Sequence, residues 1–371
     1  MILGFDKVLW HREALEKWYE TGDCYPVHAE VGLTNACNHR CPWCSVAQMQ
    51  RHATPTLMEP AILLPFLGQM RERGLKAVTL VGNGEPLSHP GAATIIRSIY
   101  DLGLEVGVFT NGSYLHGAVA ATLLGCATFV RMTMNAASPE TYAKTHGIRR
   151  DKADREFDRC VDNLREFRAY RAGRHTPTVG VQCATHQWNF RELPAQVRLV
   201  RDHIGADYFA VKPVINRSAF AGRVVTASRP RNEIPWEELE SIMAECEALS
   251  TPEFAVYVKR EQFTIALAQD YNEGAEYPSC VATPWECYIW EDGTFDICGP
   301  LRLGRPFNIQ THTFDQIWGS EERKRMIAAV DVRKCPAACR LHPLNKLLWG
   351  IRRTGLPPIL MGPPPQHINF V

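Results

Sequence analysis

The sequence has no uninterrupted apolar run of about 18 residues, the length that a membrane-spanning helix needs, so no membrane association is expected. Its first residues also lack the charged, apolar and small-residue regions of a secretory signal. Neither sign of charge is in excess, because the net charge is +1, so nucleic acid is not indicated as a partner. Together these absences predict a cytoplasmic protein that binds neither membranes nor nucleic acids.

Cysteine is the residue type whose number and placement are informative. The chain has 371 residues, 45% hydrophobic and 22% charged, as in ordinary globular proteins with one large domain and a smaller one. It contains 13 cysteines, an odd number, in a chain too long to need a disulfide scaffold. Because many of these cysteines cluster at two places, they favour metal binding in a reducing compartment.

The first cluster follows an apolar run at 27–33 and consists of Cys37, Cys41 and Cys44 in a C-x3-C-x2-C spacing. Three thiolates this close suit an iron–sulfur cluster, because soft sulfur ligands select iron and zinc over hard cations. A cube of four irons then keeps one iron open to another molecule. A structural zinc site and a disulfide pair are the alternatives. His39 lies inside the triplet, but a ring nitrogen so near in sequence rarely reaches the same metal.

With Trp43 before the last cysteine, this loop reads C-x3-C-x-aromatic-C and resembles the hallmark loop of the radical SAM superfamily. The resemblance implies that a [4Fe–4S] cluster on the three cysteines binds S-adenosylmethionine through its amino and carboxylate groups. It further implies that an electron from a reductant, such as a flavodoxin or ferredoxin, cleaves S-adenosylmethionine to a 5′-deoxyadenosyl radical.

A second segment, Gly82-Asn83-Gly84-Glu85-Pro86, resembles the glycine-rich "GGE" segment of the same family. By this resemblance Gly82 and Gly84 let the backbone approach the methionine part of the cofactor, and Glu85 binds its ammonium group. Asn83 departs from the glycine or glutamate that is commoner there. Without the cysteine loop, a glycine-rich turn after a strand would indicate only a turn.

Short apolar runs alternate with longer amphipathic ones along the middle of the chain, which predicts a parallel sheet with helices outside. Right-handed crossovers would roll this sheet into an open barrel, and the resemblance implies a partial (β/α)6 TIM-like barrel. We expect an N-terminal extension at 1–26, the barrel at 27–250, and an iron–sulfur domain with the C-terminal tail at 251–371. The expected strands are 27–33, 77–81, 105–109, 128–134, 178–184 and 208–214.

Polar residues at the ends of two expected strands are further candidates for binding the cofactor, because active sites of such barrels gather at the carboxyl ends of the strands. Thr110 and Asn111 resemble the "TNG" segment of the family. Arg131, Thr133 and Asn135 share one face of a strand, because successive side chains alternate. The resemblance implies contacts with the cofactor carboxylate and the substrate. The alternative is that the two asparagines only cap the following helices.

A second group of cysteines lies near the end of the chain and surrounds a hairpin whose turn is Asp292-Gly293. The pattern resembles the SPASM/twitch extension of many radical SAM enzymes. That resemblance implies one auxiliary [4Fe–4S] cluster, because a full SPASM domain with two clusters needs more cysteines. A buried apolar set of thiols and a zinc site are the alternatives. The implied ligands are Cys280, Cys298, Cys335 and Cys339.

Two further thiols are candidate catalytic residues. Cys287 has no ligand role in this assignment and Cys183 lies inside the fifth expected strand. A thiol near a substrate radical can donate a hydrogen atom, which would give epimerisation, whereas an electron passed to an auxiliary cluster would give oxidation. Plain burial in the core is the alternative for both cysteines. Because Cys287 is unassigned, epimerisation is slightly favoured.

The substrate class follows from the resemblance and from the 36 residues before Cys37, too few for the leader-binding domain of many peptide-modifying relatives. We therefore expect a small molecule, namely a carbohydrate- or aminocyclitol-like intermediate of natural-product (antibiotic) biosynthesis, attacked at a carbinol carbon. Lys212 could bind an anionic or hydroxylated substrate, or be an ordinary solvated lysine. Peptide (RiPP) maturation is the alternative function. A non-catalytic electron carrier would need neither an open iron nor the Gly82–Pro86 segment.

Overall fold

The protein is described by a computed structural model covering residues 4, 6–44, 54–171, 173–215, 233–269, 271–299, 306–360 and 362–371. Its centre is a nine-stranded sheet in the order β7-β6-β5-β4-β3-β2-β1-β8-β9. All neighbouring strands run parallel except the last pair, which is antiparallel. The strands are β1 His28–Val31, β2 Ala77–Leu80, β3 Glu105–Thr110, β4 Ala127–Thr133, β5 Thr178–Thr185, β6 Tyr208–Pro213, β7 Ala255–Val258, β8 Glu286–Ile289 and β9 Phe295–Asp296.

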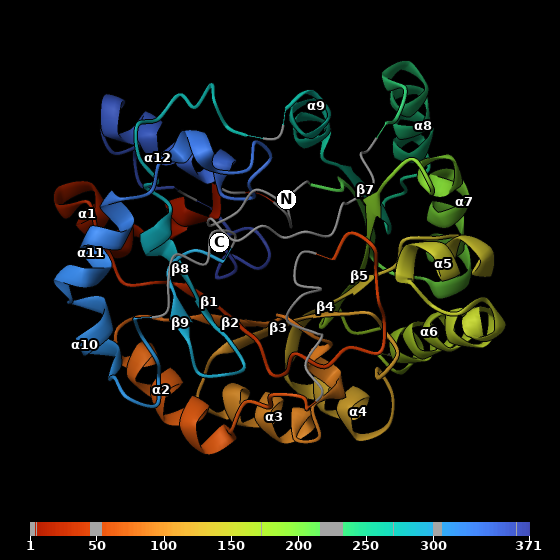
Figure 1. The fold of residues 1–371 in the computed structure, drawn as a ribbon, viewed down its shortest axis with the longest axis horizontal. Helices are drawn as coiled ribbons and strands as arrows, with labels where there is room; N and C mark the ends of the chain where they lie inside the picture. The colour runs from red at the N-terminus through yellow and green to blue at the C-terminus, as the bar shows by residue number, and fades with distance from the viewer. Residues whose placement is uncertain are drawn as a thin grey trace.

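The six predicted strands correspond to β1–β6, and the predicted partial barrel with outer helices is confirmed. Figure 1 shows the helices as an arc outside the curved sheet. The helices of this part are α2 Pro60–Glu72, α3 Ala92–Asp101, α4 Gly117–Cys126, α5 Pro139–His146, α6 Arg150–Tyr170, α7 Leu193–Arg198, α8 Trp236–Ala248 and α9 Arg260–Ala268, with a π-helical turn η5 Leu199–Ile204. The short 3-10 helices of the chain are η1 Asp6–Trp10, η3 Pro86–Ser88, η4 Phe190–Glu192, η6 Thr283–Trp285 and η7 Val332–Lys334.

Strand periodicity separates an apolar outer face of the sheet from a polar inner one. On β4, Val130 and Met132 belong to the main hydrophobic core under the helices, whereas Arg131 lies on the opposite side of the same strand and lines a cavity. The helices supply the other half of that core, for example through Ile95 and Ile99 of α3. The polar inner face marks where chemistry can occur.

The C-terminal part extends the same sheet. Strand β8 pairs in parallel with β1, and β9 folds back on β8 through a turn in which Gly293 has a φ of 78°, as the Asp292-Gly293 sequence predicted. Strand β7, which pairs with β6, also lies beyond residue 250, where the expected barrel ends. The helices that follow are α10 Phe314–Trp318, α11 Glu321–Ala328 and α12 His342–Thr354.

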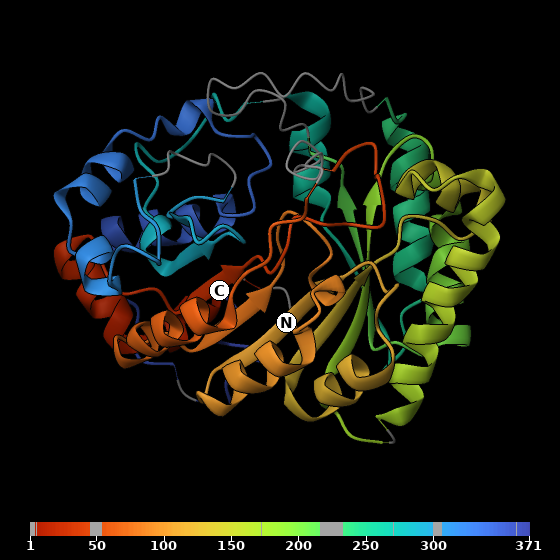
Figure 2. The same cartoon turned by 60° about the horizontal axis from the view of Figure 1, so that its bottom comes forward.

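The two ends of the chain pack together. Helix α1 (Arg12–Thr21) shares a second hydrophobic core with α12, in which Leu15 and Trp18 are buried with Leu344 and Leu348. Figure 2 shows α1 beside the C-terminal helices. The tail then enters the inner side of the sheet, where the Phe370 ring packs against Phe129 with centroids 4.8 Å apart. None of the described helices combines the length and hydropathy needed to cross a membrane.

Candidate active site

The three-cysteine loop lies over the carboxyl end of the sheet, directly after β1. Inside it the Cys44 amide donates to the Cys41 carbonyl over 3.1 Å, which curls the last turn. Two neighbouring segments hold the loop: the Glu85 amide donates to the Ala36 carbonyl over 2.8 Å, and the Arg40 amide donates to the His146 carbonyl over 2.9 Å. The fold therefore brings the cysteine loop to the Gly82–Glu85 segment, as the sequence predicted.

Glycine is required at Gly82 and Gly84 because the cysteine loop crosses them closely. A Cβ at residue 84 would lie 2.1 Å from the Ala36 carbonyl oxygen. Gly82 has a φ of 149°, and a Cβ there would lie 2.7 Å from Gly32 Cα. These glycines therefore allow the chain between β1 and the cysteine loop to pack closely against them. This role is additional to the predicted approach of the cofactor.

We expect Gly84→Ala to lose about half of its iron after reconstitution, the share of the first cluster, because the new methyl group must push the backbone that carries Cys37. A displacement of about 1 Å in such a site lowers turnover by about 100-fold. Gly125→Ala is the matched control, since a Cβ there meets nothing within 4 Å. Iron content of the two variants is the measurement. Full iron in Gly84→Ala would show that the loop tolerates another path.

Glu85 ties the second and third strand ends together. Its buried carboxylate accepts hydrogen bonds from the Thr110 hydroxyl at 2.6 Å and from the Asn111 amide at 2.7 Å. Burial raises the pKa of Glu85 to about 7, although these hydrogen bonds act in the opposite direction. A buried carboxylate that already holds two strand ends together suits a cationic partner such as an ammonium group.

Asn111 connects this edge to the cysteines. Its side-chain amide donates to the Asn38 side chain over 2.8 Å and lies 3.9 Å from the Cys37 sulfur. Burial and, next, the nearby Glu85 raise the pKa of Cys37 to about 12. Among the residues that the structure describes, the largest influences on Cys37 therefore oppose ionisation of its thiol. A metal cluster, which carries the positive charge and favours thiolate ligands, fits this donor set.

Asn83 faces the C-terminal hairpin. Its amide donates to both carboxylate oxygens of Glu291, each at 2.8 Å, and both side chains are buried. Glu291 belongs to the turn between β8 and β9. The departure of Asn83 from the resembled family segment therefore has a structural reason, because the residue bridges the cysteine side of the barrel to the C-terminal part.

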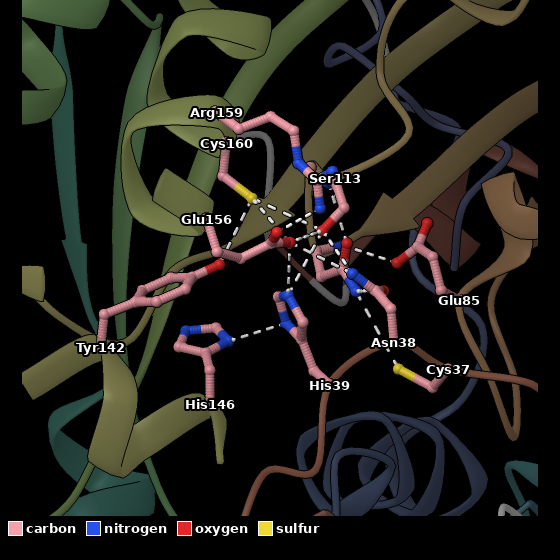
Figure 3. A network of polar contacts seen from close by, with 12 residues as sticks. Cys37, Asn38, His39, Glu85, Ser113, Tyr142, His146, Glu156, Arg159 and Cys160 are labelled. Carbon is pink, nitrogen blue, oxygen red and sulfur yellow. Dashed lines mark hydrogen bonds and ion pairs between the residues drawn. The ribbon is translucent and has the colours of Figure 1, made fainter. Parts of the chain in front are cut away.

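A polar network fixes the cysteine loop from its other side (Figure 3). The His146 Nε2 accepts the Asn135 amide at 3.0 Å, so its Nδ1 carries the hydrogen and points to His39 Nδ1 at 3.3 Å. His39 Nε2 is then the donor to Glu156 of α6 at 3.1 Å. This chain of hydrogen bonds connects the end of β4 to the cysteine loop and to α6.

The same network disfavours a zinc site. His39, Cys41 and His146 present donor atoms within 4.8 Å of one another. However, the His146 nitrogen on that side carries a hydrogen, so it cannot be a metal ligand in this arrangement. It lies 3.9 Å from the Cys41 sulfur instead, at a distance suited to donating to a thiolate. Glu156 could not be predicted from the sequence, because this residue lies more than a hundred positions from the loop that it holds.

The remaining predicted residues at the strand ends are anchored across the sheet. Asn135 Oδ1 accepts the Ala184 amide at 2.8 Å, and Thr133 accepts from the Gln182 side chain at 2.9 Å. Arg131 donates to the Tyr208 hydroxyl at 2.6 Å. The helix-cap alternative is wrong for both asparagines, since the N-cap residues of the helices that follow them are His116 and Ser138.

Trp43 lies at the edge of the cysteine loop and reaches the end of β5. Its ring stacks on His186 with centroids 5.0 Å apart and lies 5.8 Å from Trp188. Only 8% of Trp43 is exposed. The tryptophan therefore shields the last cysteine of the loop from water on this side, which suits a cluster that must not be oxidised.

The second cysteine group also comes together in part. Cys280 and Cys335 pack in one small core with Tyr277, and burial together with the charges of Cys339 and Cys280 raises the Tyr277 pKa. Asn345 of α12 donates to the Cys280 sulfur over 3.5 Å. Cys298 lies near Tyr288, whose hydroxyl contacts Arg340, the residue after Cys339. Cys280, Cys335 and Cys339 thus lie close enough to act on one another's charge, and Cys298 lies on the Tyr288 side of the same region.

Arg340, the residue after Cys339, reaches from the second cysteine group to the inner face of the sheet. Its guanidinium bonds Glu30 of β1 and lies 2.6 Å from Glu286 of β8. Burial alone would raise the pKa of Glu286, but the Arg340 charge outweighs it and holds that pKa below its ordinary value. Arg340 thus connects the second cysteine group to β1, the strand that leads into the three-cysteine loop, through Glu30.

The predicted catalytic thiols point the wrong way. Glu286 and Tyr288 face the inner side of β8 with Arg340, so Cys287 between them faces the helices and is fully buried in the main core. Cys183 lies likewise between inward residues of β5 and near Cys246 of the outer helix α8. Assignment of these two cysteines as hydrogen donors is therefore a prediction that the geometry contradicts.

Comparison with known proteins agrees with this geometry. Residues 31–179 match the family model of the radical SAM superfamily. A tungsten-containing aldehyde ferredoxin oxidoreductase cofactor-modifying protein of Pyrococcus furiosus is 24% identical over 187 residues, 49% of this chain and 50% of that protein. The chain spans half or less of the length of the curated relatives that it matches.

Two solved structures share the fold at low sequence identity. SuiB of Streptococcus suis, bound to its precursor peptide SuiA, has 13% identity and a TM-score of 0.64, covering 89% of this chain and 74% of that one. Native anSMEcpe with bound AdoMet has 11% identity and a TM-score of 0.56, covering 88% of this chain and 100% of that one. Residues 31–179, which carry the cysteine loop and the glycine segment, thus match a radical SAM domain, the kind of domain that uses S-adenosylmethionine and a [4Fe–4S] cluster.

Proposed function

We propose that this protein is a radical SAM oxidoreductase that removes hydrogen from a carbinol carbon of a small, sugar-like molecule. The observation that carries the proposal is the meeting of the cysteine loop, Gly82–Glu85 and Thr110–Asn111 at one edge of the sheet, through Glu85 and Asn111. The cluster and S-adenosylmethionine, when bound there, would supply a 5′-deoxyadenosyl radical that abstracts a hydrogen atom.

The residues at this edge of the sheet would have different roles in binding the cluster and S-adenosylmethionine. Cys37, Cys41 and Cys44 would hold the cluster, and Glu85 would bind the ammonium group of S-adenosylmethionine. Trp43 would form the edge of the cofactor site, since its ring stacks on His186 just after β5. The remaining candidates for contact with the cofactor are Gly82, Gly84, Thr110, Asn111, Arg131, Thr133 and Asn135.

The C-terminal residues would hold the second [4Fe–4S] cluster in a domain at 251–371, with Cys280, Cys298, Cys335 and Cys339 as ligands. This cluster would accept the electron that the substrate radical gives up. In the balanced step the substrate C–H hydrogen goes to the deoxyadenosyl carbon, the hydroxyl proton goes to water or a base, and one electron leaves to the cluster. A flavodoxin- or ferredoxin-type reductant would supply the first electron.

Oxidation is favoured over epimerisation because the two thiols that epimerisation would use face the helices. Epimerisation needs a hydrogen donor on the side of the substrate opposite to the radical. Cys287 and Cys183 lie under the outer helices, on the far side of their strands from the barrel interior. The slight preference for epimerisation that the sequence suggested is accordingly reversed.

Cys287→Ala should therefore keep both S-adenosylmethionine cleavage and product formation. Removal of a buried sulfur leaves a small cavity and costs about 1 kcal/mol of folding free energy. The measurements are the turnover number and the thermal midpoint of the variant, with Cys183→Ala as its partner. Continued cofactor cleavage with complete loss of product would restore the hydrogen-donor role to Cys287.

Peptide maturation is the second candidate. SuiB bound to its precursor peptide and anSMEcpe with bound peptides share the fold of this chain, which favours a peptide substrate. At 13% and 10% identity the similarity concerns the fold alone.

Deuterium transfer separates the candidates. The enzyme would be incubated with S-adenosylmethionine, dithionite and a panel of polyols and aminocyclitols deuterated at their carbinol carbons. Deuterium in 5′-deoxyadenosine and a product lighter by two hydrogens would support oxidation of a carbinol. Solvent hydrogen in a product of unchanged redox state would support epimerisation instead. Transfer from a deuterated peptide, with none from any polyol, would support peptide maturation.

A further inference from the structure

A cavity of about 160 Å³ lies inside the barrel, on the polar inner face of the sheet. Side chains from β1, β2, β3, β4, β6 and β8 line it, and the C-terminal residues His367 and Phe370 line it from the other side. Arg131 is two residues before the end of β4 and Lys212 is one before the end of β6. At 3.3 Å per residue, these two groups lie roughly 3–7 Å below the edge that carries the cysteine loop.

The lining is unusually rich in positive charge for an interior. Five cationic side chains line the cavity, against two carboxylate side chains. The cations are Lys7, Arg131, Lys212, Lys259 and Arg340, and the carboxylates are Glu30 and Glu286.

The carboxylates inside the cavity are already used. Arg340 binds both Glu30 and Glu286, so the carboxylate side chains of the lining are already engaged beside Arg131 and Lys212. Arg131 is directed instead to the Tyr208 hydroxyl and lies over the Phe109 ring at 4.8 Å. Lys212 donates to the Gln182 amide oxygen over 2.9 Å. These neutral partners satisfy hydrogen bonds but do not neutralise charge.

The positive groups act on one another. Burial and then the charges of Arg131, Lys259 and Arg340 hold the pKa of Lys212 well below its usual range. Burial and then Arg131 lower the pKa of Lys7 to about 8. Several like charges in a partly closed space are costly unless an anion joins them. An anion here would form charge-assisted hydrogen bonds that are stronger than the present neutral ones.

We propose that the cavity binds an anionic group of the substrate, a carboxylate or a phosphate, through Arg131 and Lys212. This inference rests on the proposed function, because it identifies the part of the substrate that lies below the reacting edge. The cavity holds several water molecules' worth of space but is smaller than the usual pocket for a whole drug-sized ligand. It would thus take the anionic end, while the carbon to be attacked faces the cysteine loop.

Binding of simple anions to the reconstituted protein tests the proposal. Inorganic phosphate and acetate would be titrated calorimetrically at low salt into wild type, Lys212→Gln, Lys259→Gln and Lys152→Gln. Lys152 lies exposed on α6 and serves as the matched control. We expect one anion per chain for wild type and Lys152→Gln, and affinity lower by about tenfold in Lys212→Gln, as for loss of one charge-assisted hydrogen bond. Lys259→Gln, which removes only a nearby charge, should lose less. Preference for phosphate or for acetate identifies the anionic group.

Three outcomes would overturn the proposal. No binding of either anion to wild type would do so, as would equal weakening in Lys152→Gln. Competition by S-adenosylmethionine would assign these cations to the cofactor instead. Uncoupled formation of 5′-deoxyadenosine under dithionite is measured on the same samples. If wild type cleaves the cofactor but binds no anion, this inference fails alone, whereas absence of cleavage refutes the proposed function itself.

Discussion

Replacement of Cys41 by alanine is expected to reduce 5′-deoxyadenosine formation to background. Cys41 is the middle thiol of the loop, and its sulfur lies 3.9 Å from His146 Nδ1 at the end of the hydrogen-bond chain. Two remaining thiolates cannot hold a cubane cluster that already has one open iron. The assay is anaerobic cleavage of S-adenosylmethionine with dithionite, with product quantified by chromatography.

Cys126→Ala is the control for this variant. Cys126 is also a buried thiol, but it lies at the end of α4 and contacts Arg97 rather than the loop. The control should cleave S-adenosylmethionine at the wild-type rate. Cleavage by Cys41→Ala at that same rate would contradict the assignment of the cysteine loop.

Replacement of Cys335 by alanine is expected to separate cofactor cleavage from substrate oxidation. The variant should keep the first cluster and form 5′-deoxyadenosine, but lose about four of about eight irons and all oxidised product. The reason is that Cys335 lies with Cys280 in the small core next to Tyr277, away from the three-cysteine loop. Iron content and product formation are measured together.

Cys24→Ala is the control in this case, because Cys24 is buried in the core that α1 shares with α12, near Cys280 and Cys339. It should keep both clusters and form the oxidised product. If Cys335→Ala retained all of its iron, the second cysteine group would be a set of core thiols, as the sequence allowed. Substrate oxidation would then need another electron acceptor.

Local patterns predicted most of the barrel. The six strands could be identified because each is a short apolar run followed by a turn and an amphipathic helix, and the Asp292-Gly293 pair located the hairpin turn. Helix α5 was missed, since it has only eight residues between β4 and α6. Strand β7 was missed too, because its four residues are partly buried and join the sheet only through pairing with β6.

The site was less predictable where it depends on contacts between distant segments. Asn83 with Glu291, and Arg340 with Glu30, join residues more than two hundred positions apart. No local pattern indicates such partners. The misassignment of Cys287 has a similar cause. The direction of a strand side chain follows from the neighbours of that strand, and the parallel pairing of β8 with β1 could not be inferred from residues 286–289 alone.

Iron and sulfide content, measured together with cofactor cleavage, shows whether Cys37, Cys41 and Cys44 hold a cluster that cleaves S-adenosylmethionine. Wild type and a Cys37/Cys41/Cys44 triple alanine variant would be reconstituted anaerobically and assayed for 5′-deoxyadenosine. We expect about eight irons per chain with cleavage in wild type, and about four irons with no cleavage in the triple variant. Equal iron in the two proteins, or a wild type that binds iron yet never cleaves S-adenosylmethionine, would contradict this expectation.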